Sequence, residues 1–76
     1  MKKYAEDLAK EYDWEVASEY YDYIIESLVN GQRQQVKKLF NRMKPEDQNE
    51  FLTTYLDVST GHGKSVLNIC IGELTK

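Results

Sequence analysis

Residues 31–44, GQRQQVKKLFNRMK, decide the fold because they combine a helical apolar pattern with concentrated positive charge. Apolar residues recur here at the i, i+3, i+4, i+7 spacing that places side chains on one face of an α-helix. They are Val36, Leu39, Phe40 and Met43. The stretch also contains five basic residues and no acidic one: Arg33, Lys37, Lys38, Arg42 and Lys44. We therefore predict a basic helix over residues 32–44 whose apolar face packs against its neighbours.

The charge of the rest of the chain is also arranged in blocks. Residues 1–30 contain three Lys against eight Asp and Glu, and residues 45–57 contain four acidic residues and no basic one. Residues 58–76 hold two Lys against one Glu. The basic helix therefore has an acidic neighbour on each side. Its charged face either pairs with these neighbours or remains free for a partner.

Length and composition limit the functions that the chain can carry. A chain of 76 residues buries only about 60% of the surface that its unfolded form exposes, which disfavours a deep catalytic cleft. The hydrophobic content of 41% and the charged content of 30% are typical of a folded domain. No apolar run begins the chain or approaches the roughly 18 residues of a membrane span. We expect a single helical domain over residues 1–76, a cytoplasmic location and no membrane contact.

Residues 3–29 can form either two helices or one. Residues 3–12 carry apolar side chains on one helical face, and the following segment carries the broadest apolar stripe in the chain. Asp13 could cap a second helix by accepting hydrogen bonds from its free N–H groups. The apolar i+4 series runs through Asp13 without a phase break, however, so one helix of about 27 residues, roughly 40 Å long, is the alternative. We favour a break near Tyr12–Asp13, which would leave residues 1–12 as a loosely attached N-terminal helix.

Turn residues mark the later helix boundaries. Asn30 and Gly31 both tolerate the left-handed conformation that follows a helix C-terminus. Lys44 and Pro45 mark the next boundary, because proline disfavours a helical residue before it and suits the first position of a new helix. We expect that helix to end near Val58.

The last part of the chain contains a loop at residues 59–63, or a loop with a loose first helical turn, and an apolar segment at residues 65–74. The β-branched residues of this segment favour a strand by propensity. A single strand in a helical chain would leave its backbone groups unpaired, so we predict a helix instead. Its apolar face would consist of Val66, Leu67, Cys70, Ile71 and Leu74. Short connections between successive helices then predict an all-α fold, a small bundle of four to five short helices.

Motifs for catalysis and for metal binding are incomplete. Residues 61–65, GHGKS, end like a phosphate-binding P-loop, but Val58 occupies the position of its first glycine and the preceding segment is predicted to be helical. Cys70 between two Ile is predicted to be a buried small hydrophobe, and His62 a solvent-facing loop residue. One His and one Cys are too few for a structural zinc site. We predict a protein that is not an enzyme, with no metal, no cofactor and no small-molecule substrate.

An acidic, aromatic-rich surface over residues 14–26 is the favoured binding surface. Glu15, Glu19, Asp22 and Glu26 recur at i, i+4, i+7, i+11 beside the apolar stripe. Exposed Tyr and Trp anchor many protein interfaces, although each ring can also lie on the core with its hydroxyl in water. We predict a protein-interaction or regulatory module that binds another protein or a second copy of itself. The predicted partner-binding residues are Trp14, Glu15, Glu19, Tyr21, Asp22 and Tyr23.

The basic helix supports two other interpretations. In the first, it folds back on the acidic helix, so that Arg33 pairs with Glu26 and Lys37 with Asp22. Exposed pairs of this kind contribute only about 0–1 kcal/mol each. In the second, the helix binds nucleic acid, because its side chains are of the types that reach phosphates and base edges. The nucleic-acid-binding residues of this alternative are Arg33, Gln34, Lys37, Lys38, Asn41 and Arg42.

Overall fold

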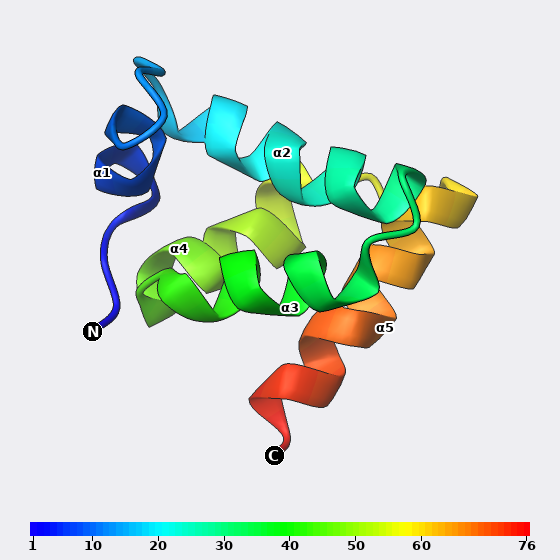
Figure 1. The fold of residues 1–76 in the computed structure, drawn as a ribbon. Coiled ribbons are helices and arrows are strands. Elements are labelled where there is room, and N and C mark those ends of the chain that lie inside the picture. The colour runs from blue at the N-terminus through cyan, green and yellow to red at the C-terminus, as the bar shows by residue number, and fades with distance from the viewer.

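The computed structural model describes residues 1–76 as helices joined by short turns. The elements are α1 (Ala5–Lys10), α2 (Ala17–Val29), α3 (Arg33–Arg42), α4 (Pro45–Glu50), the π-helical turn η1 (Phe51–Tyr55) and α5 (Gly61–Leu74). In Figure 1, α2 and α3 lie side by side with opposite chain directions, and α5 crosses near the end of α2 and the start of α3. Helix α2 is central, since it contacts α1, α3, α5 and η1. The prediction of a small all-α bundle is confirmed.

The apolar face of the basic helix is buried as predicted. Val36, Phe40 and Met43 have no exposed surface, and Leu39 is only 2% exposed. They belong to a single core of 15 buried apolar residues, to which every α-helix except α4 contributes. The buried side chain of Gln48 in α4 donates a hydrogen bond from Nε2 to the carbonyl oxygen of Phe40, 3.0 Å away. Burial of the apolar faces therefore holds α3 against α2 and α5.

The chain breaks between α1 and α2, and Asp13 causes the break in a different way from the one predicted. Asp13 adopts a left-handed backbone conformation with φ of 63°. Its N–H donates to the Lys10 carbonyl, and the N–H of Trp14 donates to the Ala9 carbonyl. These bonds close the C-terminus of α1 in a Schellman motif. Asp13 therefore ends the first helix and does not cap the second, and the single long helix is wrong.

Helix α2 begins at Ala17, four residues after Asp13, which was expected to cap it. Its N-cap residue, Val16, has an extended backbone and no side-chain oxygen to accept a hydrogen bond. The carboxylate of Glu19 in the first turn instead accepts a hydrogen bond from the Glu15 N–H, at 3.1 Å. At the other end, the predicted stop is confirmed: Gly31 has φ of 77°.

The boundary at Pro45 is also confirmed, since Pro45 is the first residue of α4. The helix continues from α4 into the π-helical turn, which the sequence does not predict. It ends at Tyr55, before the predicted end near Val58. The N–H of Leu56 closes the turn by donating to the Phe51 carbonyl five residues earlier, at 2.8 Å.

Helix α5 includes most of the predicted loop as well as the apolar segment over residues 65–74, for which a strand had also been considered. The helix begins at Gly61, so residues 61–63 form its first turn. The prediction of a loop alone is wrong for them, and the alternative with a first helical turn is closer. The Thr60 hydroxyl caps the helix by accepting from the Gly63 N–H, at 2.9 Å. The helix predicted over residues 65–74 is confirmed. Its apolar face is partly wrong, because Ile71 is 45% and Leu74 53% exposed.

The N-terminal segment pairs with the end of α3. The N–H of Lys3 donates to the Arg42 carbonyl, and the N–H of Lys44 donates to the Lys3 carbonyl, both at 2.8 Å. Helix α1 therefore begins at Ala5, after two residues that were predicted to be helical. Three α1 residues, Ala5, Leu8 and Ala9, have no exposed surface. None of the helices combines the length and the apolar character that crossing a lipid bilayer requires.

Candidate interaction surfaces

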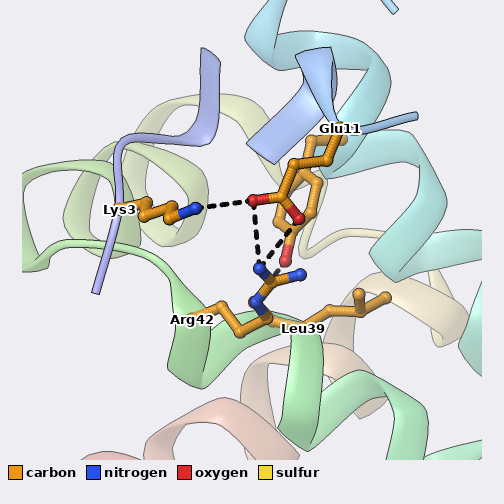
Figure 2. A network of polar contacts seen from close by, with 5 residues as sticks. Lys3, Glu11, Leu39 and Arg42 are labelled. Carbon is orange, nitrogen blue, oxygen red and sulfur yellow. Dashed lines mark hydrogen bonds and ion pairs between the residues drawn. The ribbon is translucent and has the colours of Figure 1, made fainter. Parts of the chain in front are cut away.

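A network of three charged side chains joins the N-terminal segment, α1 and α3. The Glu11 carboxylate accepts hydrogen bonds from Lys3 Nζ and from Arg42 Nη2, each at 2.9 Å. Figure 2 shows Lys3 and Arg42 converging on this carboxylate from different parts of the chain. The two cations lower the pKa of Glu11 below its ordinary value, and the carboxylate raises the pKa of Arg42. Arg42 is therefore engaged within the chain.

The predicted pairing between α2 and α3 is wrong. The ion pairs in this structure are Lys3–Glu11, Lys10–Glu6, Arg42–Glu11 and Lys76–Glu73. Neither Arg33 with Glu26 nor Lys37 with Asp22 is among them. Because α2 and α3 pack through their apolar faces, their charged faces remain at the surface without meeting.

We define the acidic face of α2 as Glu15, Glu19, Asp22 and Glu26, with Glu15 just before the first turn. All four are exposed. None forms an ion pair, although two accept hydrogen bonds from neutral donors. Glu19 accepts from the Glu15 N–H, and the Asp22 carboxylate accepts from the Tyr55 hydroxyl. Burial, followed by this hydrogen bond, raises the pKa of Tyr55 to about 12.

An aromatic cluster lies at the N-terminal end of this face. It consists of Tyr12, Trp14 and Tyr23. The rings of Tyr12 and Trp14 stack with centroids 4.8 Å apart, and the Tyr23 ring meets each of them edge-on at 5.4 Å. Tyr12 is exposed, whereas Trp14 and Tyr23 are half-buried. The Tyr23 hydroxyl accepts a hydrogen bond from Gln35 Nε2 at 2.9 Å, which fixes the cluster against α3.

Tyr21 does not belong to the exposed surface. It is only 3% exposed, and its ring packs against Phe51 and Tyr55. Its hydroxyl donates to Glu50 Oε2 at 2.9 Å. Burial and this bond raise the pKa of Tyr21. The prediction that Tyr21 belongs to the partner-binding surface is therefore wrong. The helical spacing at Tyr21 allowed either a core or a surface position.

The basic side of α3 is divided between engaged and free side chains. Asn41 Nδ2 donates to Glu73 Oε1 at 2.7 Å, and Arg42 is held by Glu11. Arg33 and Lys38 are exposed, Lys37 is half-buried, and none of the three forms an ion pair. Gln34 is also exposed. The six residues of the nucleic-acid alternative therefore do not act as one uniform surface.

A groove of about 370 Å³ lies between α3 and α5. Three of its lining residues come from the basic helix, and four come from the second half of α5. They are Arg33, Gln34, Lys37, Asn68, Ile69, Gly72 and Glu73. The α5 residues were not predicted as site residues, because no spacing within one helix reveals which residues of another helix will face it.

The remaining motif residues have structural positions. Gly61 begins a helix and no strand precedes it, so GHGKS does not form a P-loop. His62 is exposed in the first turn of α5 and does not lie in a loop. Cys70 is buried as predicted, and burial raises the pKa of its thiol to about 12.

Comparison with known protein families, with curated proteins and with solved structures finds no match for this chain. Function is therefore inferred from the chemistry and geometry of the surfaces described above.

Proposed function

We propose that the protein is a cytoplasmic, non-catalytic interaction module that binds a basic segment of a protein partner. The binding surface combines the acidic face of α2 with the aromatic cluster of Tyr12, Trp14 and Tyr23. The observation that supports this proposal is the absence of any cationic partner for the four carboxylates of that face within their own chain. Tyr21 is excluded from the surface because it is buried.

The electrostatics of the face favour a cationic partner. Like charges at i, i+4 repel one another by a few tenths of a kcal/mol per pair, and an approaching cationic side chain relieves that repulsion. The aromatic cluster adds a second attraction, because Lys and Arg also bind the faces of Trp and Tyr rings. Tyr12 and Trp14 already stack on each other, so little side-chain entropy is lost when a partner covers them.

The intrinsic fluorescence of Trp14, the only Trp in the chain, provides a direct test. Titration with a Lys-rich helical peptide should change the emission, and added salt should weaken the binding. The variant Glu15→Gln with Glu26→Gln removes two carboxylates whose side chains make no hydrogen bond in the chain. We expect it to weaken binding by up to about thirtyfold, since each of the two exposed ion pairs contributes roughly 0–1 kcal/mol.

The control variant removes two carboxylates outside the face, Glu6→Gln with Glu46→Gln. It changes the net charge by the same amount, so a purely global charge effect would weaken both variants equally. Equal binding by the test variant and the wild type would contradict the proposal.

Nucleic-acid binding by α3 is the second candidate. It is favoured by the three basic side chains that have no carboxylate partner: Arg33, Lys37 and Lys38. It is disfavoured by the engagement of Arg42 with Glu11 and of Asn41 with Glu73. A shift on duplex or single-stranded nucleic acid that falls with salt, and that Lys37→Glu with Lys38→Glu abolishes, would support this candidate over the first.

A further inference from the structure

The groove between α3 and α5 has an excess of uncompensated positive charge. Arg33 and Lys37 line it without an ion-pair partner, and Glu73 is its one lining carboxylate. That carboxylate is already engaged, because it accepts from Asn41 Nδ2 at 2.7 Å and pairs with Lys76 Nζ at 3.1 Å. Hydrogen bonds from these two partners lower the pKa of Glu73. The charge of Lys37 also lowers this pKa, and the lining residues together keep one net positive charge, which favours an anionic occupant.

The α5 side of the groove is open because Gly72 has no side chain. A Cβ placed on Gly72 would meet no atom within 4 Å. Ile69 supplies the one apolar surface of the groove, and the amides of Gln34 and Asn68 can donate hydrogen bonds to a carboxylate. A surface of this kind suits carboxylate side chains that project from a helix. Their cationic partners would be Arg33 and Lys37 of α3.

The spacing of the two cations matches the spacing of the acidic face. Arg33 and Lys37 are four residues apart, which places them one above the other at about one helical turn, 5.4 Å. Within α2 the acidic face has this i, i+4 spacing once, as Asp22 with Glu26, whereas Glu15 precedes the helix. An α2 helix lying along the groove can therefore present two carboxylates in register with the two cations.

These complementary surfaces do not meet within one molecule. Helices α2 and α3 pack through buried apolar residues, including Tyr20 and Val36, and no ion pair joins them. We propose that the groove between α3 and α5 binds the acidic face of α2 from a second copy of this chain. This inference rests on the proposed function, because it identifies the partner of that face as the protein itself.

Sedimentation equilibrium of the purified full chain tests the proposal. The average mass of the wild type should rise above that of the monomer with concentration, and high salt should return it to the monomer. Two charge-reversal variants should remain monomeric: Glu15→Lys with Glu26→Lys, and Arg33→Glu with Lys37→Glu. An equimolar mixture of the two should associate again, because each reversed surface then faces its opposite.

A neutral change tests the shape of the groove separately from its charge. Gly72→Gln places a side chain in the open space and should raise the dissociation constant at least tenfold. Gly61→Gln is the matched control, since a Cβ at Gly61 also meets no atom within 4 Å but lies at the opposite end of α5. Far-ultraviolet circular dichroism confirms that each variant is folded before its mass is interpreted.

The outcomes separate this inference from the proposed function. A wild type that stays monomeric at millimolar concentration, while Trp14 still responds to the Lys-rich peptide, overturns self-association alone. Loss of the peptide response as well overturns both. Association that neither charge-reversal variant reduces, or that their mixture fails to restore, also overturns the inference, because another surface then holds the copies together.

Discussion

At the scale of single residues, Gly63 is required by the packing of α5 on the turn before it. A Cβ at Gly63 would overlap with the backbone carbonyl oxygen of Asp57 and lie 2.7 Å from its carbonyl carbon. We expect Gly63→Ala to lower the free energy of unfolding by about 1–3 kcal/mol, because backbone atoms must shift to admit the methyl group. Urea unfolding measures this change.

Gly72→Ala provides the control in the same helix. Its Cβ would meet no atom within 4 Å, and alanine favours a helix over glycine by about 0.5–1 kcal/mol. We expect this variant to be more stable than the wild type by up to that amount. Equal stability of the two alanine variants would show that the carbonyl of Asp57 does not restrict position 63.

The backbone conformation of Asp13 also has a measurable cost in stability. Its φ of 63° lies in the left-handed region, which costs an ordinary residue roughly 1–2 kcal/mol and glycine very little. Asp13→Gly should therefore raise the free energy of unfolding by up to about 1 kcal/mol, and Asp13→Val should lower it by at least as much. Thermal unfolding followed by circular dichroism tests both changes. A destabilised Asp13→Gly variant would mean that the Asp side chain contributes more than the strain costs.

At the scale of helices, local patterns predicted which residues form most of the helices and which face of the basic helix is buried. The apolar face of residues 32–44 is dense and regular, and all four of its members are buried. The turn residues Gly31 and Pro45 act through backbone rules that hold in any context, so their boundaries were also predicted. For the same reason, the break at Asp13 could be located although its mechanism was misread.

The errors concern features that depend on more than one helix. Glu11 and Arg42 are 31 residues apart in the chain, and only the docking of α1 beside the end of α3 brings them together. The groove combines residues of α3 and α5, so neither segment alone indicates it. Ile71 and Leu74 fit an apolar stripe, but α5 turns Val66 and Cys70 to the core and leaves these two exposed. Helix-crossing geometry is not encoded in the spacing of a single helix.

The Glu11 network controls how firmly the N-terminal segment is attached. The pKa of Glu11 is lower in the folded chain than its ordinary value of 4.5 because Lys3 and Arg42 donate hydrogen bonds to it. The network therefore stabilises the attachment fully above pH 4.5 and loses this effect as the pH falls through the lowered folded pKa. We expect the amide protons of Lys3 and Lys44, which form the backbone bridge, to lose protection from hydrogen exchange in that acidic range.

Glu11→Gln should remove this acid dependence and lower the protection of both amides at neutral pH. The matched control is Glu6→Gln, since Glu6 makes only an exposed, longer ion pair of 3.7 Å with Lys10. Nuclear magnetic resonance resolves the individual amides. Unchanged exchange in Glu11→Gln would indicate that the backbone hydrogen bonds alone hold the segment.

At the scale of the whole molecule, Tyr21 joins α2 to the α4–η1 arm, residues 45–55. It also makes the free energy of unfolding depend on pH in the alkaline range. Burial, together with the hydrogen bond to Glu50, raises the pKa of Tyr21 above its ordinary value of 10.0. The unfolded chain releases the proton near pH 10, whereas the folded chain retains it to higher pH. The stabilising effect is therefore present below pH 10 and is lost as the pH rises towards the folded pKa.

Urea unfolding at a series of pH values tests this linkage. Tyr21→Phe should lower stability at neutral pH by about 0.5–1.5 kcal/mol, because one partly buried hydrogen bond is lost. Above pH 10 its stability should fall less steeply than that of the wild type.

Tyr4→Phe is the control, since the Tyr4 side chain is exposed and its hydroxyl makes no hydrogen bond in the chain. Its stability should fall above pH 10 as steeply as that of the wild type. If the stability of Tyr21→Phe fell above pH 10 as steeply as that of the wild type, the effect would come from the other tyrosines whose pKa is raised, Tyr20 and Tyr55. The hydrogen bond from Tyr55 to Asp22 would then remain as a polar link between α2 and the α4–η1 arm.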